Sequence, residues 1–195
     1  MGVIKTALEI ALEKTENVKS DKSSINQFEA KQQGKKIANA FLAGELNIAD
    51  ELKKAPAAEK ESLKQGIFDV LITQIALPSA KEDENKLEKV GKGLSSIIKS
   101  GEFTAFLRQL TQIFSKYLQE AAHYEKAIRQ QYAPKIRQKE EELSRRLGRE
   151  VRIDPLQDPE FVAFHNQHMK ALKSNYEDVV EQARDEIKRM FYNTF

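Results

Sequence analysis

Apolar side chains recur at intervals of three and four residues along most of the chain, which is the pattern of amphipathic helices. These intervals predict helices over about 3–18, 24–43, 57–77, 102–148 and 159–193, with one or two helical turns over 47–55 and a charged helix over 79–90. Only Val151-Arg152-Ile153 resembles a short extended piece. We therefore expect an all-α fold, a helical bundle.

The most regular apolar pattern lies in the second half of the chain. Steps of four and three residues alternate without a break, as in the a/d seam of a coiled coil, through Phe103, Leu107, Leu110, Phe114, Tyr117, Ala121, Tyr124 and Ile128. Two steps of four then lead to Tyr132 and Ile136, a stutter that coincides with Pro134. A kink is predicted there because proline disturbs the helix interior. The seam resumes weakly at Leu143 and Leu147.

The helices over 102–148 and 159–193 are joined by about ten residues, so we expect them to fold back as a long antiparallel hairpin. Asp158 is a good N-cap for the second helix, with Pro159 at its first position. A turn centred near residue 153 would place Arg129 opposite Glu177, Asp178 and Glu181. The two arms also have complementary charge. Residues 126–152 hold nine Lys and Arg against four Glu, and residues 154–195 hold five Lys and Arg against eight Asp and Glu.

A glycine-rich stretch is the best internal boundary, because residues 91–101 hold three of the eight glycines. We expect a region of three or four helices over 1–100 and the hairpin over 101–195, packed together as one unit. At about 1.5 Å per residue the helix over 102–148 would be about 70 Å long. That is longer than a protein of this size needs, so its distal half beyond Pro134 should be available to a partner.

Composition restricts the classes of function. The 195 residues include 32 Lys and Arg, 30 Asp and Glu and no Cys, with a formal net charge of +2. Balanced charge gives no general attraction to nucleic acid or anionic membranes. The lack of cysteine excludes disulfides, thiol catalysis and cysteine-based zinc sites. No apolar run of 18 residues occurs and the first residues do not resemble a signal peptide, so we expect a cytoplasmic protein without a membrane span.

Few residues offer catalytic or metal chemistry. Glu120-Ala-Ala-His123 is half of a di-iron motif that lacks a second copy. His165 and His168 share a helix, and the expected hairpin register places Glu141 near them, so a metal-binding helical bundle is one alternative. Nucleophile-elbow, zinc-protease and phosphate-loop motifs do not occur in the sequence. We therefore predict a protein that is not an enzyme and needs no cofactor.

Arginines gather around the predicted turn. Arg145, Arg146, Arg149 and Arg152 could grip phosphates, which makes nucleic-acid binding by the hairpin tip a second alternative. No aromatic residue is interleaved among them to stack on bases. The same arginines could instead pair with the acidic residues nearby, which makes nucleic acid the weaker expectation.

Aromatic residues give the main indication of function. Phe106 and Phe164 lie beside the seams, so the hairpin should have two apolar faces. One face closes the hairpin, and the other must meet the amino-terminal helices or a second copy. Phe191 and Phe195 belong to an apolar carboxyl-terminal segment that should dock in its own chain or on a partner. We predict a helical protein-protein interaction or scaffold protein that self-associates as a homodimer.

Overall fold

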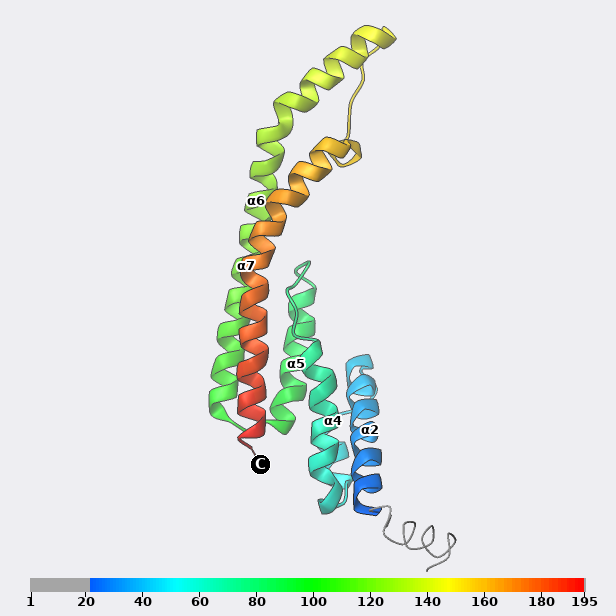
Figure 1. Cartoon of the computed structure of the whole chain (residues 1–195), viewed down its shortest axis with the longest axis vertical. Coiled ribbons are helices and arrows are strands. Elements are labelled where there is room, and N and C mark those ends of the chain that lie inside the picture. Colours follow the sequence, from blue (N-terminus) through cyan, green and yellow to red (C-terminus); the bar gives the residue numbers. More distant parts are fainter. Residues whose placement is uncertain (1–21, 195) are drawn as a thin grey trace, which may run out of the picture. The chain divides into compact units, whose positions relative to one another are not determined.

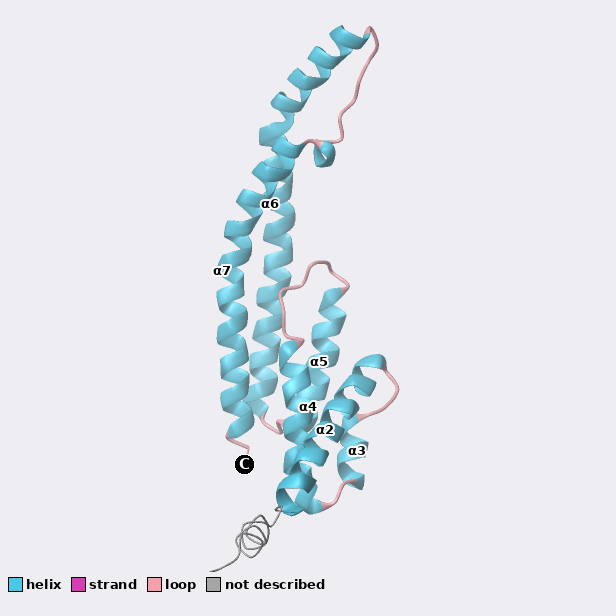
Figure 2. Ribbon diagram, turned by 45° about the vertical axis from the view of Figure 1, so that its right-hand side comes forward, coloured by secondary structure: helices cyan, strands magenta, loops and turns pink. Residues whose placement is uncertain are grey.

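The computed structural model describes residues 22–194, which form six α-helices and two short 3-10 helices without any strand (Figures 1 and 2). The prediction of an all-α fold is confirmed. The helix predicted over 3–18 and Phe195 lie outside the described residues. The chain divides into two compact units, one reaching to Gln74 and including Lys92–Ile97, the other made of Ile75–Gly91 and the residues from Ile98 onward. The units therefore do not follow the predicted boundary at residue 100.

The first unit contains α2 (Lys22–Ala43), α3 (Ile48–Lys54), the 3-10 helix η1 (Ala57–Glu59) and α4 (Lys60–Thr73). Helices α2 and α4 lie side by side in both views (Figures 1 and 2). They meet at Gly34 and Gly66, where a side chain on either glycine would collide with the backbone of the other helix. The salt bridge Lys31–Asp69, 2.9 Å long, links the same two helices. The pair is therefore packed backbone against backbone.

Helix α4 ends at Thr73, several residues before the predicted end at Pro78. Ile75 is fully buried although it is not helical. Its carbonyl oxygen accepts a hydrogen bond from Arg184 Nε at 2.9 Å, which replaces the bond that a continuing helix would provide. The apolar spacing predicted the burial of Ile75 correctly but could not show that a side chain distant in sequence would satisfy its backbone.

Helix α5 (Asp83–Ile97) runs through the glycine-rich stretch that we expected to be a boundary. Both glycines inside it face closely packed side chains. A Cβ atom on Gly91 would lie 2.9 Å from Leu107 Cδ1, and one on Gly93 would lie 2.8 Å from Leu71 Cδ1. These two glycines therefore allow α5 to pack closely against its neighbours, and they do not form a flexible linker.

The second unit is built on α6 (Gly101–Leu147) and α7 (Pro159–Tyr192), which lie side by side and run in opposite directions (Figure 1). Ser100 caps the start of α6 by accepting a hydrogen bond from the Glu102 amide, and Gly148 ends it with a left-handed φ of 64°. Helix α6 continues without a break through Pro134, and a kink there stays a prediction. Asp158 caps α7 and Pro159 occupies its first turn, as the sequence predicted.

The pairing register of α6 and α7 differs from the prediction. The Arg129 guanidinium lies 5.9 Å from the ring centre of Phe161 and bonds Glu125 at 2.9 Å, so placing it opposite Glu177 and Glu181 was wrong. The ring of Phe161 also contacts Tyr132, with 5.3 Å between ring centres. Helix α7 is thus shifted by several turns along α6.

The shift arises because the connection between the helices is not symmetric. Helix α6 continues past the start of α7, and residues 149–154 run back along its last turns (Figure 1). The Val151 amide donates to Ser144 Oγ at 3.0 Å, and the Ile153 amide donates to Glu140 Oε1 at 2.9 Å. We call residues 149–154 the return segment.

Burial along the seam follows this register. Most predicted seam positions up to Ile136 are buried, namely Phe103, Leu110, Phe114, Tyr117, Ile128, Tyr132 and Ile136. Leu143 and Leu147 are 37% and 56% exposed. The reason is that α7 begins beside Lys139 of α6 and does not reach these two leucines. Tyr124 is also 46% exposed. Coiled-coil packing along the seam remains a prediction.

Candidate functional site

An apolar groove lies between α6 and α7 in the second unit. It has a volume of about 360 Å³ and is lined by Phe106, Gln109, Leu110, Ile113, Val179, Gln182, Ala183 and Glu186. Leu110 and Ala183 are buried and form its floor, whereas Ile113 is 37% exposed. Phe106 and Val179 are half-buried. We call this feature the α6–α7 groove.

The charge at the edge of the α6–α7 groove is compensated. Glu186 is the charged residue in the lining, and its carboxylate accepts two hydrogen bonds from the Arg189 guanidinium. These bonds lower the pKa of Glu186 and raise the pKa of Arg189. Arg189 also lies 3.6 Å from Glu102, which joins the end of α7 to the start of α6. The groove therefore combines an apolar interior with an edge of neutral glutamines and a paired carboxylate.

A polar cluster fixes the start of α7 against α6. Asp158 is 4% exposed, and its carboxylate accepts hydrogen bonds from the amides of Glu160 and Phe161 and from Lys139 Nζ at 2.6 Å. Lys139 also bonds Glu160 at 3.0 Å, and the Tyr132 hydroxyl donates to the same carboxylate at 3.3 Å. We call these four residues Tyr132, Lys139, Asp158 and Glu160 the polar lock.

The electrostatics of the polar lock follow from its hydrogen bonds. The bond from Lys139 lowers the pKa of Asp158 despite its burial and also lowers the pKa of Glu160. The two carboxylates in turn raise the pKa of Lys139, while burial raises the pKa of Tyr132. Sequence reasoning identified Asp158 as a cap but missed its partner, because the predicted register did not bring Lys139 to the start of α7.

A second polar tie joins α6 and α7 nearer their other ends. The Tyr176 hydroxyl donates to Glu120 Oε2 at 2.7 Å, and its ring lies 4.9 Å from that of Tyr117. Burial and the adjacent carboxylate raise the pKa of Tyr176 to about 12. Glu120 is the glutamate of the segment Glu120-Ala-Ala-His123, which resembles half of a di-iron motif. Its carboxylate thus accepts a hydrogen bond from a tyrosine hydroxyl.

The structure does not assemble the predicted metal ligands. His168 Nδ1 bonds the carbonyl oxygen of Phe164 at 2.8 Å within α7, and His165 Nδ1 lies 3.4 Å from Asn166 Oδ1. Glu141 is exposed and lies 3.9 Å from Arg145. Within residues 22–194 no group of three His, Cys, Asp or Glu side chains could hold a metal ion. The cause is the shifted register, which brings Phe164, the neighbour of His165, to Tyr132 instead of to Glu141.

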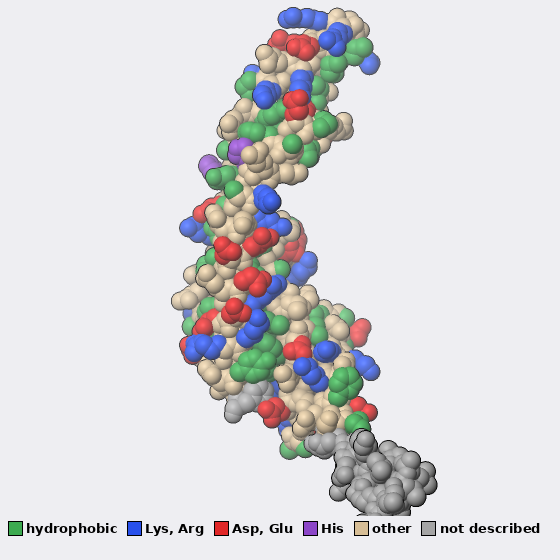
Figure 3. Space-filling model, in the orientation of Figure 1, with side chains coloured by type: hydrophobic (Ala, Val, Ile, Leu, Met, Phe, Trp, Pro, Cys, Tyr) green, Lys and Arg blue, Asp and Glu red, His purple; other side chains and the backbone are tan. Residues whose placement is uncertain are grey.

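The predicted tip arginines lie at the end of α6 and in the return segment. All four, Arg145, Arg146, Arg149 and Arg152, are exposed. Arg152 pairs with Glu150 at 2.9 Å, and Arg145 lies near Glu141, so two of them have acidic neighbours. Figure 3 shows basic side chains at this end of the hairpin interspersed with acidic and hydrophobic ones. The tip is therefore a mixed surface rather than a continuous basic patch.

The predicted aromatic contacts fall into three environments. Phe106 lines the α6–α7 groove. Phe164 is half-buried against Tyr132 and His168, with ring centres 5.4 and 4.2 Å apart. Phe191 is fully buried within its own chain, so its assignment as a partner contact is corrected to a core position. Of these three aromatic residues, Phe106 is the one that lines an open groove.

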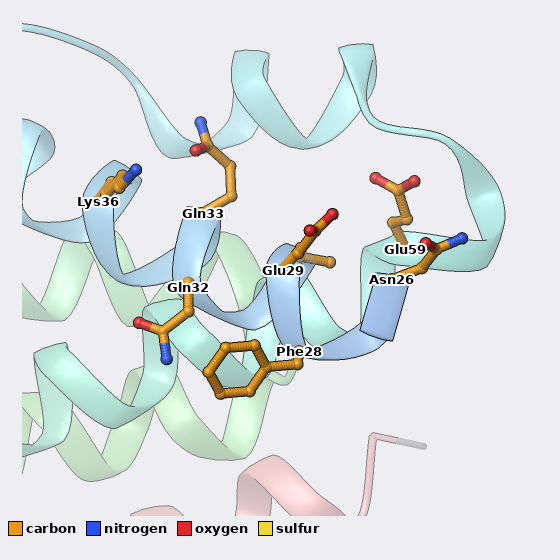
Figure 4. Close-up of a pocket in the computed structure, with 8 residues that line it drawn as sticks. Asn26, Phe28, Glu29, Gln32, Gln33, Lys36 and Glu59 are labelled. Atoms are coloured by element: carbon orange, nitrogen blue, oxygen red, sulfur yellow. The ribbon is translucent and has the colours of Figure 1, made fainter. Parts of the chain in front are cut away.

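A second hollow of about 440 Å³ lies on the first unit. Figure 4 shows its lining side chains, which come from α2 except for Glu59 of η1: Asn26, Phe28, Glu29, Gln32, Gln33 and Lys36. Phe28 is 63% exposed, and each polar side chain in the lining is exposed or half-buried. With no buried polar group in its lining, this hollow is an open surface feature of α2.

The fold and the groove together define a class of protein. It is an all-α protein in which a long antiparallel helix pair carries an apolar groove. No helix in residues 22–194 is both long and apolar enough to cross a lipid bilayer. The chain belongs to DUF6657, a family of unknown function, whose model matches residues 49–189. That range contains the whole α6–α7 groove. Searches of curated proteins and of solved structures found no match to the chain.

Proposed function

We propose that this protein is a non-enzymatic helical interaction or scaffold protein that acts in the cytoplasm and self-associates through the α6–α7 groove. The observation that supports this proposal is the apolar groove, in which Ile113 is 37% exposed beside the half-buried Phe106 and Val179. Grouped apolar surface of this kind is costly to leave in water and marks interaction sites.

A second copy is the partner that suits the edge of the groove best. Two-fold association brings the same surface patch of both copies together, so each residue must be compatible with itself. Gln109 and Gln182 line the groove, and a glutamine amide can both donate and accept hydrogen bonds. Two copies of such an edge can pair without like-charge repulsion, and Glu186 is already neutralised by Arg189.

The length of the helix pair supplies the remaining contact area. A stable interface buries about 800 Å² on each partner. The groove alone is smaller than that, but α6 has 47 residues and α7 has 34. We propose that the interface extends from the groove along the neighbouring turns of both helices, with the groove as its apolar centre, and ends before the start of α7 and the last turns of α6.

Light scattering coupled to size-exclusion chromatography tests this proposal. We expect the mass of a dimer at micromolar concentrations, and Ile113→Glu should convert it to the mass of the 22.3 kDa chain. Leu143→Glu is the matched control, because Leu143 is also 37% exposed on α6 but lies outside the groove. A wild-type chain that is monomeric at all concentrations, or a dimer that survives Ile113→Glu, would contradict the proposal.

A further inference from the structure

A separate hollow of about 180 Å³ lies where α7 begins beside α6. It is lined by Arg129, Tyr132, Ala133, Ile136, Arg137, Glu140, Pro155 and Phe161. Its walls are mainly apolar, with the ring of Phe161 and Pro155 on one side and α6 on the other. An apolar cavity of about 150 Å³ is already large enough to take up benzene. This hollow therefore has room for one small ring.

The small side chain of Ala133 leaves this space open, and two arginines flank it. Arg129 and Arg137 lie four residues before and after Ala133, so all three share one face of α6. Arg129 is held by two hydrogen bonds to Glu125 and lies over the ring of Phe161. Arg137 is exposed and forms no ion pair within residues 22–194. The hollow thus combines an apolar interior with a cation that has no anionic partner in the described chain.

The acidic groups around the hollow are engaged elsewhere. Glu140 is part of the lining, but its Oε1 accepts the hydrogen bond from the Ile153 amide in the return segment. Asp158 and Glu160 both bond Lys139. One ammonium does not balance two carboxylates, so the polar lock keeps a net charge of −1. The attraction for an anion therefore comes from the Arg137 guanidinium, which has no ion pair among the described residues and can form a charge-assisted hydrogen bond, and not from the summed charge around the hollow.

We propose that this hollow binds a small free carboxylic acid with a flat apolar body. The apolar body lies over Ala133 against Phe161 and Pro155, and the carboxylate meets the Arg137 guanidinium in a charge-assisted hydrogen bond. Arg129, held over Phe161 and paired with Glu125, lines the other side of the hollow. This site is independent of the α6–α7 groove and of the proposed self-association.

Titration of the full-length, ¹⁵N-labelled protein with benzoate and with benzyl alcohol tests the site by NMR. We expect benzoate to bind with a dissociation constant in the millimolar range, as is typical of so small a ligand. It should shift the amide signals of Ala133 and Phe161. Benzyl alcohol, which lacks the charge, should bind roughly tenfold more weakly. Equal affinity for the two probes, or shifts elsewhere in the chain only, would overturn the proposal.

Two variants test separately the charged part of the site and its apolar part. Arg137→Gln should weaken benzoate binding roughly five- to tenfold and leave benzyl alcohol unchanged. Arg146→Gln, which removes another exposed arginine of α6, is the matched control and should change neither. Ala133→Phe should abolish binding of both probes by filling the hollow. Since Arg137 is exposed, Arg137→Gln tests the site even if Ala133→Phe destabilises the protein, and unchanged benzoate binding in Arg137→Gln would overturn the assignment.

Discussion

The helix pairs α2–α4 and α6–α7 are held together by opposite means. In the first pair, Gly34 and Gly66 let two backbones touch, and the Gly66 Cα atom would lie only 3.1 Å from a Cβ atom on Gly34. In the second pair, large rings separate the helices, with Phe161 fully buried against Tyr132. Removing volume should therefore damage the second pair, whereas adding volume should damage the first.

The two pairs also differ in their polar connections. Helices α2 and α4 share the half-exposed salt bridge Lys31–Asp69. Helices α6 and α7 are joined by the polar lock at the start of α7 and by the bond from Tyr176 to Glu120 further along. Because these bonds join particular residues of α6 and α7, they favour one register of the pair. Substitutions in each pair test this difference.

Phe161→Ala should give the largest loss of stability, about 3–5 kcal/mol, because it leaves a cavity in the buried cluster of Ile128, Tyr132, Ile136 and Phe161. Urea unfolding would measure this loss. Leu156→Ala serves as the control, since Leu156 is 55% exposed and should cost less than about 0.5 kcal/mol. Similar losses in both variants would show that the register described for α7 is wrong.

Gly66→Ala should destabilise the α2–α4 pair by about 2–3 kcal/mol, because the added methyl group collides with the Lys31 carbonyl. The loss should appear although alanine favours helix more than glycine does. Gly101→Ala is the matched control, with no atom within 4 Å of the added group. Hydrogen exchange would locate the effect in α2 and α4, and unchanged or slower exchange there would contradict the close approach.

Asp158→Ala should remove the cap of α7 and cost about 1–2 kcal/mol at neutral pH. The folded state lowers the pKa of Asp158 below its ordinary value of 3.8, so its contribution is present above that value and declines as the pH falls through it. The stability difference between wild type and variant, measured by urea unfolding at pH 7 and pH 3, should therefore shrink in acid. An equal difference at both pH values would contradict an ionised, hydrogen-bonded Asp158.

Tyr176→Phe should have the smallest effect, about 1 kcal/mol, since it removes one hydrogen bond and keeps the ring against Tyr117. Thermal unfolding would measure it. Tyr124→Phe, at a position 46% exposed, should leave the unfolding temperature unchanged. Equal effects of both substitutions would mean that the bond to Glu120 contributes nothing to the helix pair.

Apolar periodicity predicted the helices well because it reports burial directly. The bounds of α6 and α7 agree with the expected ranges 102–148 and 159–193 to within one residue. The cap at Asp158 was also predicted, because a cap and its helix are neighbours in sequence. What failed was the pairing of distant segments: the asymmetric turn depends on bonds from the return segment to Ser144 and Glu140, which no spacing rule contains.

The same limit explains the candidate sites. The predicted register of α6 and α7 was wrong by several turns. It therefore paired His165 with Glu141, which do not meet in the structure, and it did not predict the contact between Lys139 and Asp158. Phe106 could be predicted to lie on a second apolar face because it stands beside the seam. Phe191 could not be separated from it by sequence, since both follow helical spacing. Gly66 carried no signal in the apolar pattern, although it determines how α2 and α4 meet.

Site-specific cross-linking tests the proposed self-association most directly. The chain has no cysteine, so a single Gln109→Cys substitution introduces one reactive thiol at the edge of the α6–α7 groove. With a short flexible bis-maleimide, we predict a covalent dimer for Gln109→Cys that is lost when Ile113→Glu is added, and little dimer for Arg146→Cys at the other end of α6. A Gln109→Cys chain that stays monomeric, or links no faster than Arg146→Cys, would contradict association through the groove.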